Sequence, residues 1–181
     1  MNYKYEKTWQ DVDVDKKVQL DEVVDWGQHY EIQLKFLIQQ TFSCVGSQEL
    51  CQFDLLEIKE TKTSGSYDKM INIGVRSDGK LNFCLGDGEC KISDFTIGQT
   101  IFFYLNTYQE NGITMKRVNI NGRYVTVEES ENALSKFNVS IILGNEGNFA
   151  PGTVIIKSLK IKADSECSPI GRLDMNCKDT K

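Results

Sequence analysis

The sequence has 181 residues, with 21 lysines and arginines against 26 aspartates and glutamates, which gives a formal net charge of −5. The basic residues are scattered singly, whereas a nucleic-acid-binding protein concentrates positive charge to displace counterions from phosphates, so we expect no nucleic-acid partner. No stretch approaches the roughly 18 apolar residues of a membrane-spanning helix, and we expect no membrane insertion. One domain of this length buries about 70% of its unfolded surface.

Alternating residues near the N-terminus predict a first strand between residues 3 and 25, in which the run DVDVDKKV sets acids against valines. Acids are also calcium ligands. On an extended strand, however, Asp11, Asp13 and Asp15 would lie about 7 Å apart along one face, too far to share one ion without help from another loop. We therefore interpret this run as the solvated face of a strand.

The clearest period-two pattern lies in HYEIQLKFLIQQTFSC, residues 29–44. It places Ile32, Leu34, Phe36 and Ile38 on one face and polar residues on the other, which is typical of a half-buried strand.

A second strand is predicted over CQFDLLEIKE, residues 51–60, with Phe53, Leu55 or Leu56, and Ile58 facing inward. The two consecutive leucines shift the phase of the alternation. This shift predicts a β-bulge.

Turn residues divide the next part of the chain. Residues 61–68, TKTSGSYD, form a polar loop by their composition. Strands are then predicted over residues 70–76 and 80–85, joined by a turn at residues 77–79.

Residues 98–129 predict three consecutive strands. Asn111-Gly112 and Asn121-Gly122 fall between the apolar runs, and both residue types tolerate the positive φ of a type I′ hairpin turn. Two such turns about ten residues apart indicate an antiparallel meander.

The C-terminal third predicts two more strands, over residues 137–144 and 152–163, after a helical turn or loop at residues 129–136. Nine or ten short strands with frequent turn signals indicate an all-β, antiparallel two-sheet jelly-roll sandwich. This sandwich occupies residues 1–163. Residues 164–181 form a polar C-terminal tail with a cysteine-closed loop.

Six cysteines indicate the compartment. No C-x-x-C is present, and with one histidine in the chain a zinc site would need an almost all-cysteine shell. We expect disulfides, and therefore a secreted or extracellular domain. Six cysteines allow fifteen connectivities, and buried free thiols remain the alternative. The nearest-neighbour pairing is Cys44 with Cys51, Cys84 with Cys90, and Cys167 with Cys177.

The order of signals in residues 71–86, 100–125 and 139–161 resembles the laminin G-like and concanavalin A-like group of jelly-roll domains. The resemblance implies extracellular recognition of glycans or other proteins through loops at one rim, sometimes with calcium. The paired aspartates of the calcium-binding members match no two positions in this sequence. We therefore assign no metal ligand and expect no cofactor, with calcium left open.

One branch of the same fold hydrolyses β-glucans with a strand motif E-[hydrophobic]-D-x-(x)-E, which residues 52–57, QFDLLE, resemble. Retaining hydrolysis needs two carboxyls about 5 Å apart. Gln52 occupies the nucleophile position and carries no charge. His29 is the lone histidine, and a single histidine at a strand start is a surface residue far more often than a catalytic base. We therefore expect no enzyme.

Two loops, residues 86–90 and 144–152, are rich in Gly, Asn and acids. Asn and acidic side chains hydrogen-bond sugar hydroxyls, and a phenyl ring provides an apolar face for a pyranose. Such residues also occur in ordinary turns. Asn138-Val139-Ser140 is an N-glycosylation acceptor sequence. The candidate ligand-binding residues are Asp87, Glu89, Asn145, Glu146, Asn148 and Phe149.

The first functional hypothesis is a non-catalytic, lectin-like or adhesion module that binds a glycan or an extracellular protein. The second is a protein–protein adhesion or self-recognition domain that uses a sheet face. The third is a degenerate glycoside hydrolase. The sequence leaves the ligand and the oligomeric state open.

Overall fold

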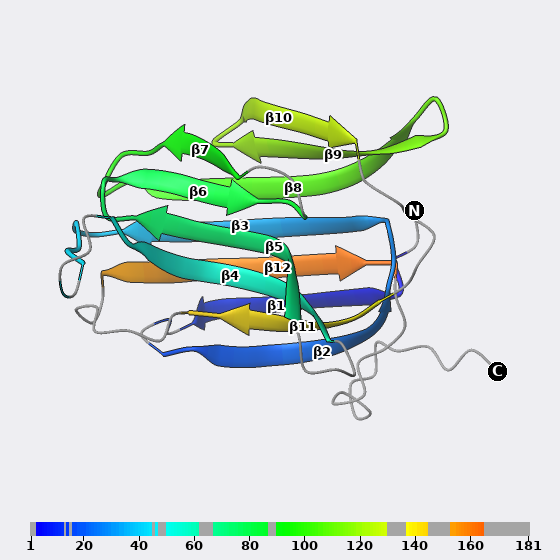
Figure 1. Ribbon diagram of the computed structural model, residues 1–181, viewed down its shortest axis with the longest axis horizontal. Coiled ribbons are helices and arrows are strands. Elements are labelled where there is room, and N and C mark those ends of the chain that lie inside the picture. The colour runs from blue at the N-terminus through cyan, green and yellow to red at the C-terminus, as the bar shows by residue number, and fades with distance from the viewer. Residues whose placement is uncertain are drawn as a thin grey trace.

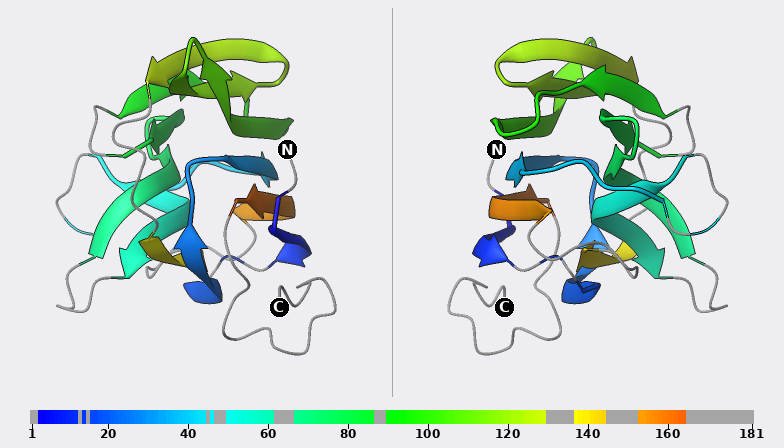
Figure 2. Two further views of the ribbon diagram at one scale, coloured as in Figure 1. Left: turned by 90° about the vertical axis from the view of Figure 1, so that its right-hand side faces the viewer. Right: turned by 90° about the vertical axis from the view of Figure 1, so that its left-hand side faces the viewer.

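A computed structural model describes residues 3–12, 14, 16–44, 46, 50–61, 67–86, 90–129, 137–144 and 153–164. Over these residues the chain forms two antiparallel six-stranded sheets that pack face to face (Figures 1 and 2). The described residues contain no helix. The expected all-β jelly-roll sandwich is confirmed.

Sheet A has the strand order β1-β12-β3-β8-β9-β10, and every neighbouring pair is antiparallel. Its central strands come from distant parts of the sequence, whereas β8, β9 and β10 are consecutive. The strands are β1 (Tyr5–Val12), β3 (Tyr30–Ile38), β8 (Thr100–Glu110), β9 (Ile113–Ile120), β10 (Arg123–Glu129) and β12 (Val154–Ala163).

Sheet B has the order β2-β11-β4-β5-β6-β7 and faces the viewer in Figure 1. The chain changes sheet after each of the strands β1, β2, β3, β7, β10 and β11. The strands are β2 (Val18–Trp26), β4 (Gln52–Thr61), β5 (Tyr67–Arg76), β6 (Lys80–Cys84), β7 (Lys91–Asp94) and β11 (Phe137–Leu143).

The core lies between the sheets and contains the residues that the alternation predicted. Ile32, Leu34 and Phe36 of β3 are fully buried. Phe83 of sheet B meets Phe103 of sheet A edge-on, with 5.4 Å between ring centroids. Burial of such side chains supplies the main favourable term in folding.

The predicted first strand is wrong, because residues 3–25 form two strands in different sheets. β1 ends at Val12 in sheet A and β2 begins at Val18 in sheet B. Asp11 has a φ of 48°, and Val14 in the connection is only 1% exposed. The alternating run therefore crosses from one sheet to the other with a valine in the core, and Asp13 and Asp15 lie outside the described residues.

One buried carboxylate joins the two sheets at this crossing. The Tyr5 hydroxyl of β1 donates to Asp21 Oδ2 of β2 at 2.8 Å, and Lys7 Nζ lies 2.9 Å from the same oxygen. Burial, together with the Asp21 carboxylate, raises the pKa of Tyr5. A charge at this depth costs free energy unless it is paired and hydrogen-bonded, and Asp21 is both.

The meander predicted over residues 98–129 is confirmed as β8, β9 and β10. Asn111 and Asn121 have a φ of 51°, and the glycines that follow them also have positive φ, as type I′ turns require. The hairpins form one side of sheet A, with β10 at its edge (Figure 1). Strand β7 was not predicted from the sequence, because its four residues are too few to show a clear alternation.

Candidate ligand-binding face

A β-bulge in β4 determines which side chains share the outer face of sheet B. The register with β5 shifts between Asp54 and Leu56, as the phase change in the sequence predicted. Leu55 and Leu56 are both buried, so one residue is added between the inward positions. Asp54 and Glu57 are separated by an odd number of positions, so on a regular strand their side chains would point to opposite faces. The bulge brings both to the outer face with Gln52.

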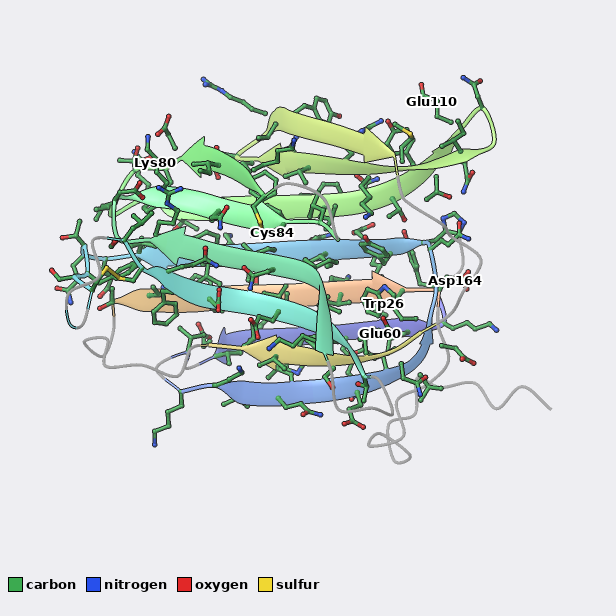
Figure 3. All side chains as sticks on the ribbon, viewed as in Figure 1. Trp26, Glu60, Lys80, Cys84, Glu110 and Asp164 are labelled. Carbon is green, nitrogen blue, oxygen red and sulfur yellow. A yellow bond between two sulfur atoms is a disulfide. The ribbon has the colours of Figure 1, made fainter. Side chains whose placement is uncertain are left out.

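Two rows of residues run across this outer face. Asp54, Gly74 and Asn82 lie directly opposite one another on β4, β5 and β6, and Asn82 faces Ile92 of β7. In Figure 3, Lys80 and Cys84 mark the two ends of β6 on the sheet nearest the viewer. The end-on views of Figure 2 show no described strand over this face. The neighbouring row contains Glu57, Asn72 and Cys84.

The Gln52 amide is the centre of a hydrogen-bond network on this face. Its Nε2 donates to Asp54 Oδ1 at 2.6 Å and to Asn72 Oδ1 at 2.8 Å. Its Oε1 accepts from Asn82 Nδ2 at 2.6 Å. Because both hydrogens and the carbonyl oxygen of this amide are engaged, the bonds hold side chains of three adjacent strands in one arrangement.

Gly74 creates the space in which the Gln52 amide lies. A Cβ atom at position 74 would stand 2.5 Å from Gln52 Nε2 and 2.7 Å from its Cδ. Any side chain at this position therefore displaces Gln52. Glycine inside a strand marks such a close approach.

Asn72 extends the network to a second carboxylate. Its Nδ2 donates to Asp54 Oδ1 at 3.1 Å and to Glu57 Oε1 at 3.3 Å. Glu57 is only 3% exposed, and its Oε2 lies 2.7 Å from Lys59 Nζ and 3.8 Å from Lys17 Nζ. Two lysines therefore balance the charge of this carboxylate.

A bidentate ion pair lies beside the network. Arg76, directly opposite Gln52 in the register, donates from Nε to Asp78 Oδ1 at 3.2 Å and from an Nη atom to Asp78 Oδ2 at 2.6 Å. The two parallel bonds hold the guanidinium in place. Arg76 is therefore already paired within the protein.

Two of the three predicted disulfides are confirmed, and both border this face. Cys44 is bonded to Cys51, the residue before Gln52, and Cys84 is bonded to Cys90. Ser77 holds the first bridge to the turn between β5 and β6, because its N–H donates to the Cys51 carbonyl at 2.9 Å. The predicted bridge between Cys167 and Cys177 lies outside the described residues.

The six candidate ligand-binding residues in the two loops all lie outside the described residues: Asp87, Glu89, Asn145, Glu146, Asn148 and Phe149. The residues that precede these loops are described. The Gly144 N–H donates to the Leu55 carbonyl at 3.2 Å, and Lys116 Nζ donates to the Leu85 carbonyl at 2.7 Å. Gly144, the last described residue before position 145, therefore lies next to the β4 bulge.

The predicted glycosylation residue Asn138 is exposed on β11, where its Oδ1 accepts from the Asp25 N–H at 3.2 Å. Its modification stays a prediction. Ser140 of the same acceptor sequence is buried, within hydrogen-bond distance of Thr61.

The outer face of sheet A has a different chemistry. The Arg117 guanidinium carbon lies 4.1 Å from the centre of the Tyr108 ring and 5.2 Å from that of Tyr124, which is 69% exposed. The rings of Phe102 and Tyr104, two residues apart on β8, are nearly parallel at 8°. These residues form an aromatic face on sheet A.

The structure gives no site for a metal among the residues it describes, since no group of three or more His, Cys, Asp or Glu side chains there is arranged to hold an ion. Within the same residues, no helix is long and apolar enough to cross a membrane.

The amide side chains of the network were not predicted from the sequence as functional residues. In the sequence, Gln52 appeared only as a missing nucleophile, and Asn72 and Asn82 fell within predicted strands without an assigned role. A polar residue at period two has the same pattern whether it faces water or a ligand. The useful signal was the phase shift at Leu55-Leu56, which places Asp54 and Glu57 on one face.

Comparison with solved structures shows the fold. A sialidase of Trypanosoma rangeli, with 2,3-difluorosialic acid as a covalent intermediate, superposes with a TM-score of 0.55 and 8% identity. The match covers 77% of this chain and 21% of the sialidase chain. A β-fructofuranosidase of Schwanniomyces occidentalis, complexed with fructosyl-erythritol, gives a TM-score of 0.57 and 12% identity, over 90% of this chain and 33% of that enzyme.

The chain therefore spans about a fifth to a third of the length of these two enzymes. The galectin LEC-6 of Caenorhabditis elegans has 14% identity and a TM-score of 0.47, over 85% of this chain and 94% of the galectin. No family model and no curated protein matches the sequence. At these identities the likeness is one of fold: a jelly-roll sandwich.

Proposed function

We propose that this chain is a secreted, non-catalytic recognition module that binds a glycan on the outer face of sheet B. The observation that carries the proposal is the network around Gln52. Amides and carboxylates from three strands are held in one arrangement on a face that no described strand covers. Side chains held in place before a ligand arrives lose little entropy on binding.

The chemistry of this face favours a glycan over a protein. Sugar hydroxyls both donate and accept hydrogen bonds, as amides do, and carboxylates accept strongly. The cores of protein interfaces are instead depleted in acids and enriched in aromatic residues and arginine. Asp54, Asn82 and Gln52 therefore suit a hydroxyl-rich ligand, and the two disulfides support an extracellular setting.

The non-catalytic part of the proposal rests on Gln52. The bulge gives Gln52, Asp54 and Glu57 the common face that the glucanase-like motif needs. However, the first position has an amide that cannot attack an anomeric carbon. Glu57 is paired with Lys59 and Lys17, whereas an acid catalyst must hold a proton. Turnover of a β-glucan by the unmodified protein would contradict this part and revive the hydrolase hypothesis.

A glycan array tests the binding. Gln52→Ala removes the centre of the network, and Gln33→Ala is the matched control, because Gln33 lies on β3 of the opposite sheet and bonds to Glu31. We expect array binding by the wild type and the control, and at least tenfold weaker binding by Gln52→Ala. Equal binding by all three proteins would remove this face from consideration. The same array with EDTA tests calcium dependence.

A second candidate function uses the aromatic face of sheet A. Tyr, Phe and Arg are enriched in protein interfaces, and Arg117 lies between two tyrosines there. This face favours the adhesion hypothesis. Loss of a captured extracellular protein on Tyr124→Ala, with glycan binding unchanged, would support it.

A further inference from the structure

We infer that the ligand of the sheet B face is an uncharged, hydroxyl-rich sugar held by Asp54 and Asn82. The inference rests on the proposed function and names the ligand class. Three observations support it: the hydrogen-bonding atoms of the network that remain available, the carboxylate that no described cation contacts, and the neighbours of these groups.

The two central amides have no donors left. Both hydrogens of Gln52 Nε2 are used, by Asp54 and by Asn72. Both hydrogens of Asn72 Nδ2 are used, by Asp54 and by Glu57. Each amide nitrogen carries only two hydrogens. Gln52 and Asn72 therefore position the array, and the ligand contacts fall to its outer members.

Those outer members are Asp54 and Asn82, which are both partly exposed. Asp54 accepts both of its bonds at Oδ1, so Oδ2 is unoccupied by the described part of the chain. Asn82 donates one hydrogen to Gln52, and among the described residues nothing bonds its second hydrogen or its Oδ1. The face therefore presents a charged acceptor on one side of Gln52, and a donor with an acceptor on the other.

Charge decides against an anionic ligand. Arg76 balances Asp78, two lysines balance Glu57, and Lys80 balances Asp94 at the sheet edge. Asp54 contacts only neutral amides within the described chain. A carboxylated or sulfated sugar would bring a like charge to this oxygen, which is unfavourable.

The surroundings of Asn82 favour a sugar over a cation. An ammonium group only donates, so it would leave the second Asn82 hydrogen without an acceptor, whereas a hydroxyl both donates and accepts. Ile92, directly opposite Asn82 and 52% exposed, provides an apolar surface beside these polar groups. A pyranose has both a polar edge and an apolar C–H face.

The experiment titrates the wild type, Asp54→Asn, Asn82→Ala and Asp94→Asn with a neutral oligosaccharide from the array and its sulfated derivative. Asp94→Asn is the matched control, because it removes the same charge at the edge of the same face, from a side chain that is 86% exposed. A deacetylated, cationic analogue is the third probe. Circular dichroism and thermal unfolding verify that each variant is folded.

The wild type should bind the neutral sugar at least tenfold more tightly than the sulfated one. Asp54→Asn should weaken binding of the neutral sugar about tenfold and reduce the preference for the neutral over the sulfated sugar. Asn82→Ala should weaken binding of the neutral sugar by a similar factor. Asp94→Asn should bind both sugars as the wild type does. Equal affinity for the sulfated probe, tighter binding of the cationic probe, or unchanged affinity in Asp54→Asn and Asn82→Ala would overturn the inference while glycan binding stands. Absence of binding to any glycan would overturn the proposed function as well.

Discussion

The outer faces of the two sheets differ in what their side chains bond to. On sheet A, exposed ion pairs such as Lys160 with Glu6, and a guanidinium between two tyrosines, form an ordinary solvated surface with an aromatic region. On sheet B, Gln52, Asp54 and Asn72 bond mainly to one another. Exposed pairs contribute little to stability. The proposed binding role rests on the ordered polar network, which only the uncovered face of sheet B has among the described residues.

The two sides of β6 provide the sharpest form of this comparison, because Phe83 points into the core and its neighbour Asn82 points outward. Phe83→Ala removes the contact with Phe103 and should lower the free energy of unfolding by about 3–5 kcal/mol. Asn82→Ala should lower it by less than about 1 kcal/mol. Urea denaturation measures both. Similar losses for the two variants would mean that the network is structural.

The disulfide beside the network should matter for both stability and binding. Its cysteines are seven residues apart, and a double Cys44→Ser/Cys51→Ser variant should lose about 2 kcal/mol, since the bridge restricts the unfolded chain. Because Cys51 precedes Gln52, binding should weaken as well. Urea denaturation and glycan titration measure the two effects. Unchanged glycan affinity would show that the bridge does not position the network.

Gly74→Ala tests whether the position of the Gln52 side chain matters for binding, because this substitution moves Gln52 without removing a polar group. The new Cβ would displace Gln52, a flexible side chain, so the stability cost should be under about 1 kcal/mol. Glycan affinity should fall about tenfold. The control is Gly79→Ala, in the nearby turn, where nothing lies within 4 Å but the positive φ makes alanine strained. If glycan affinity falls in proportion to the loss of stability in both variants, Gln52 has no positioning role.

On sheet A, the shifted pKa of Tyr104 should make the free energy of unfolding depend on pH in the alkaline range. Burial, with the nearby Glu31 carboxylate, raises the pKa of Tyr104 from 10.0 to about 12. The folded chain then holds the phenol proton more tightly than the unfolded chain, so this stability is fully present below about pH 10 and is lost as pH rises toward 12. Urea midpoints at pH 9 and 11.5 should differ less in Tyr104→Phe than in the wild type. If the urea midpoint changes equally with pH in the two proteins, Tyr104 does not cause the loss of stability.

The smallest effect on glycan affinity is expected for Arg117→Ala. It removes cation–π contacts with Tyr108 and the highly exposed Tyr124, which at exposed sites are worth about 0.5–1 kcal/mol each at most. Glycan affinity should not change. A loss of glycan affinity in this variant would place sugar binding on sheet A and reverse the assignment of the two faces.

The sequence by itself determined what depends on neighbouring residues. Alternation identified β3, paired Asn-Gly turns identified β8 to β10, and the adjacent Leu55 and Leu56 identified the bulge. Short separations also led to the two confirmed disulfides. In each case the physical cause lies within a few residues of chain, as a side-chain period, a positive φ or a short loop.

Only the tertiary structure decided how the strands are arranged and where the candidate site lies. The chain crosses between sheets after Val12, which no local pattern distinguishes from a continuing strand. Gln52 bonds to Asn82, 30 residues away, because β4, β5 and β6 are neighbours and Gly74 leaves room between them. Strand order and register place polar residues together, and these come from contacts between distant parts of the chain that single-sequence periodicity does not contain.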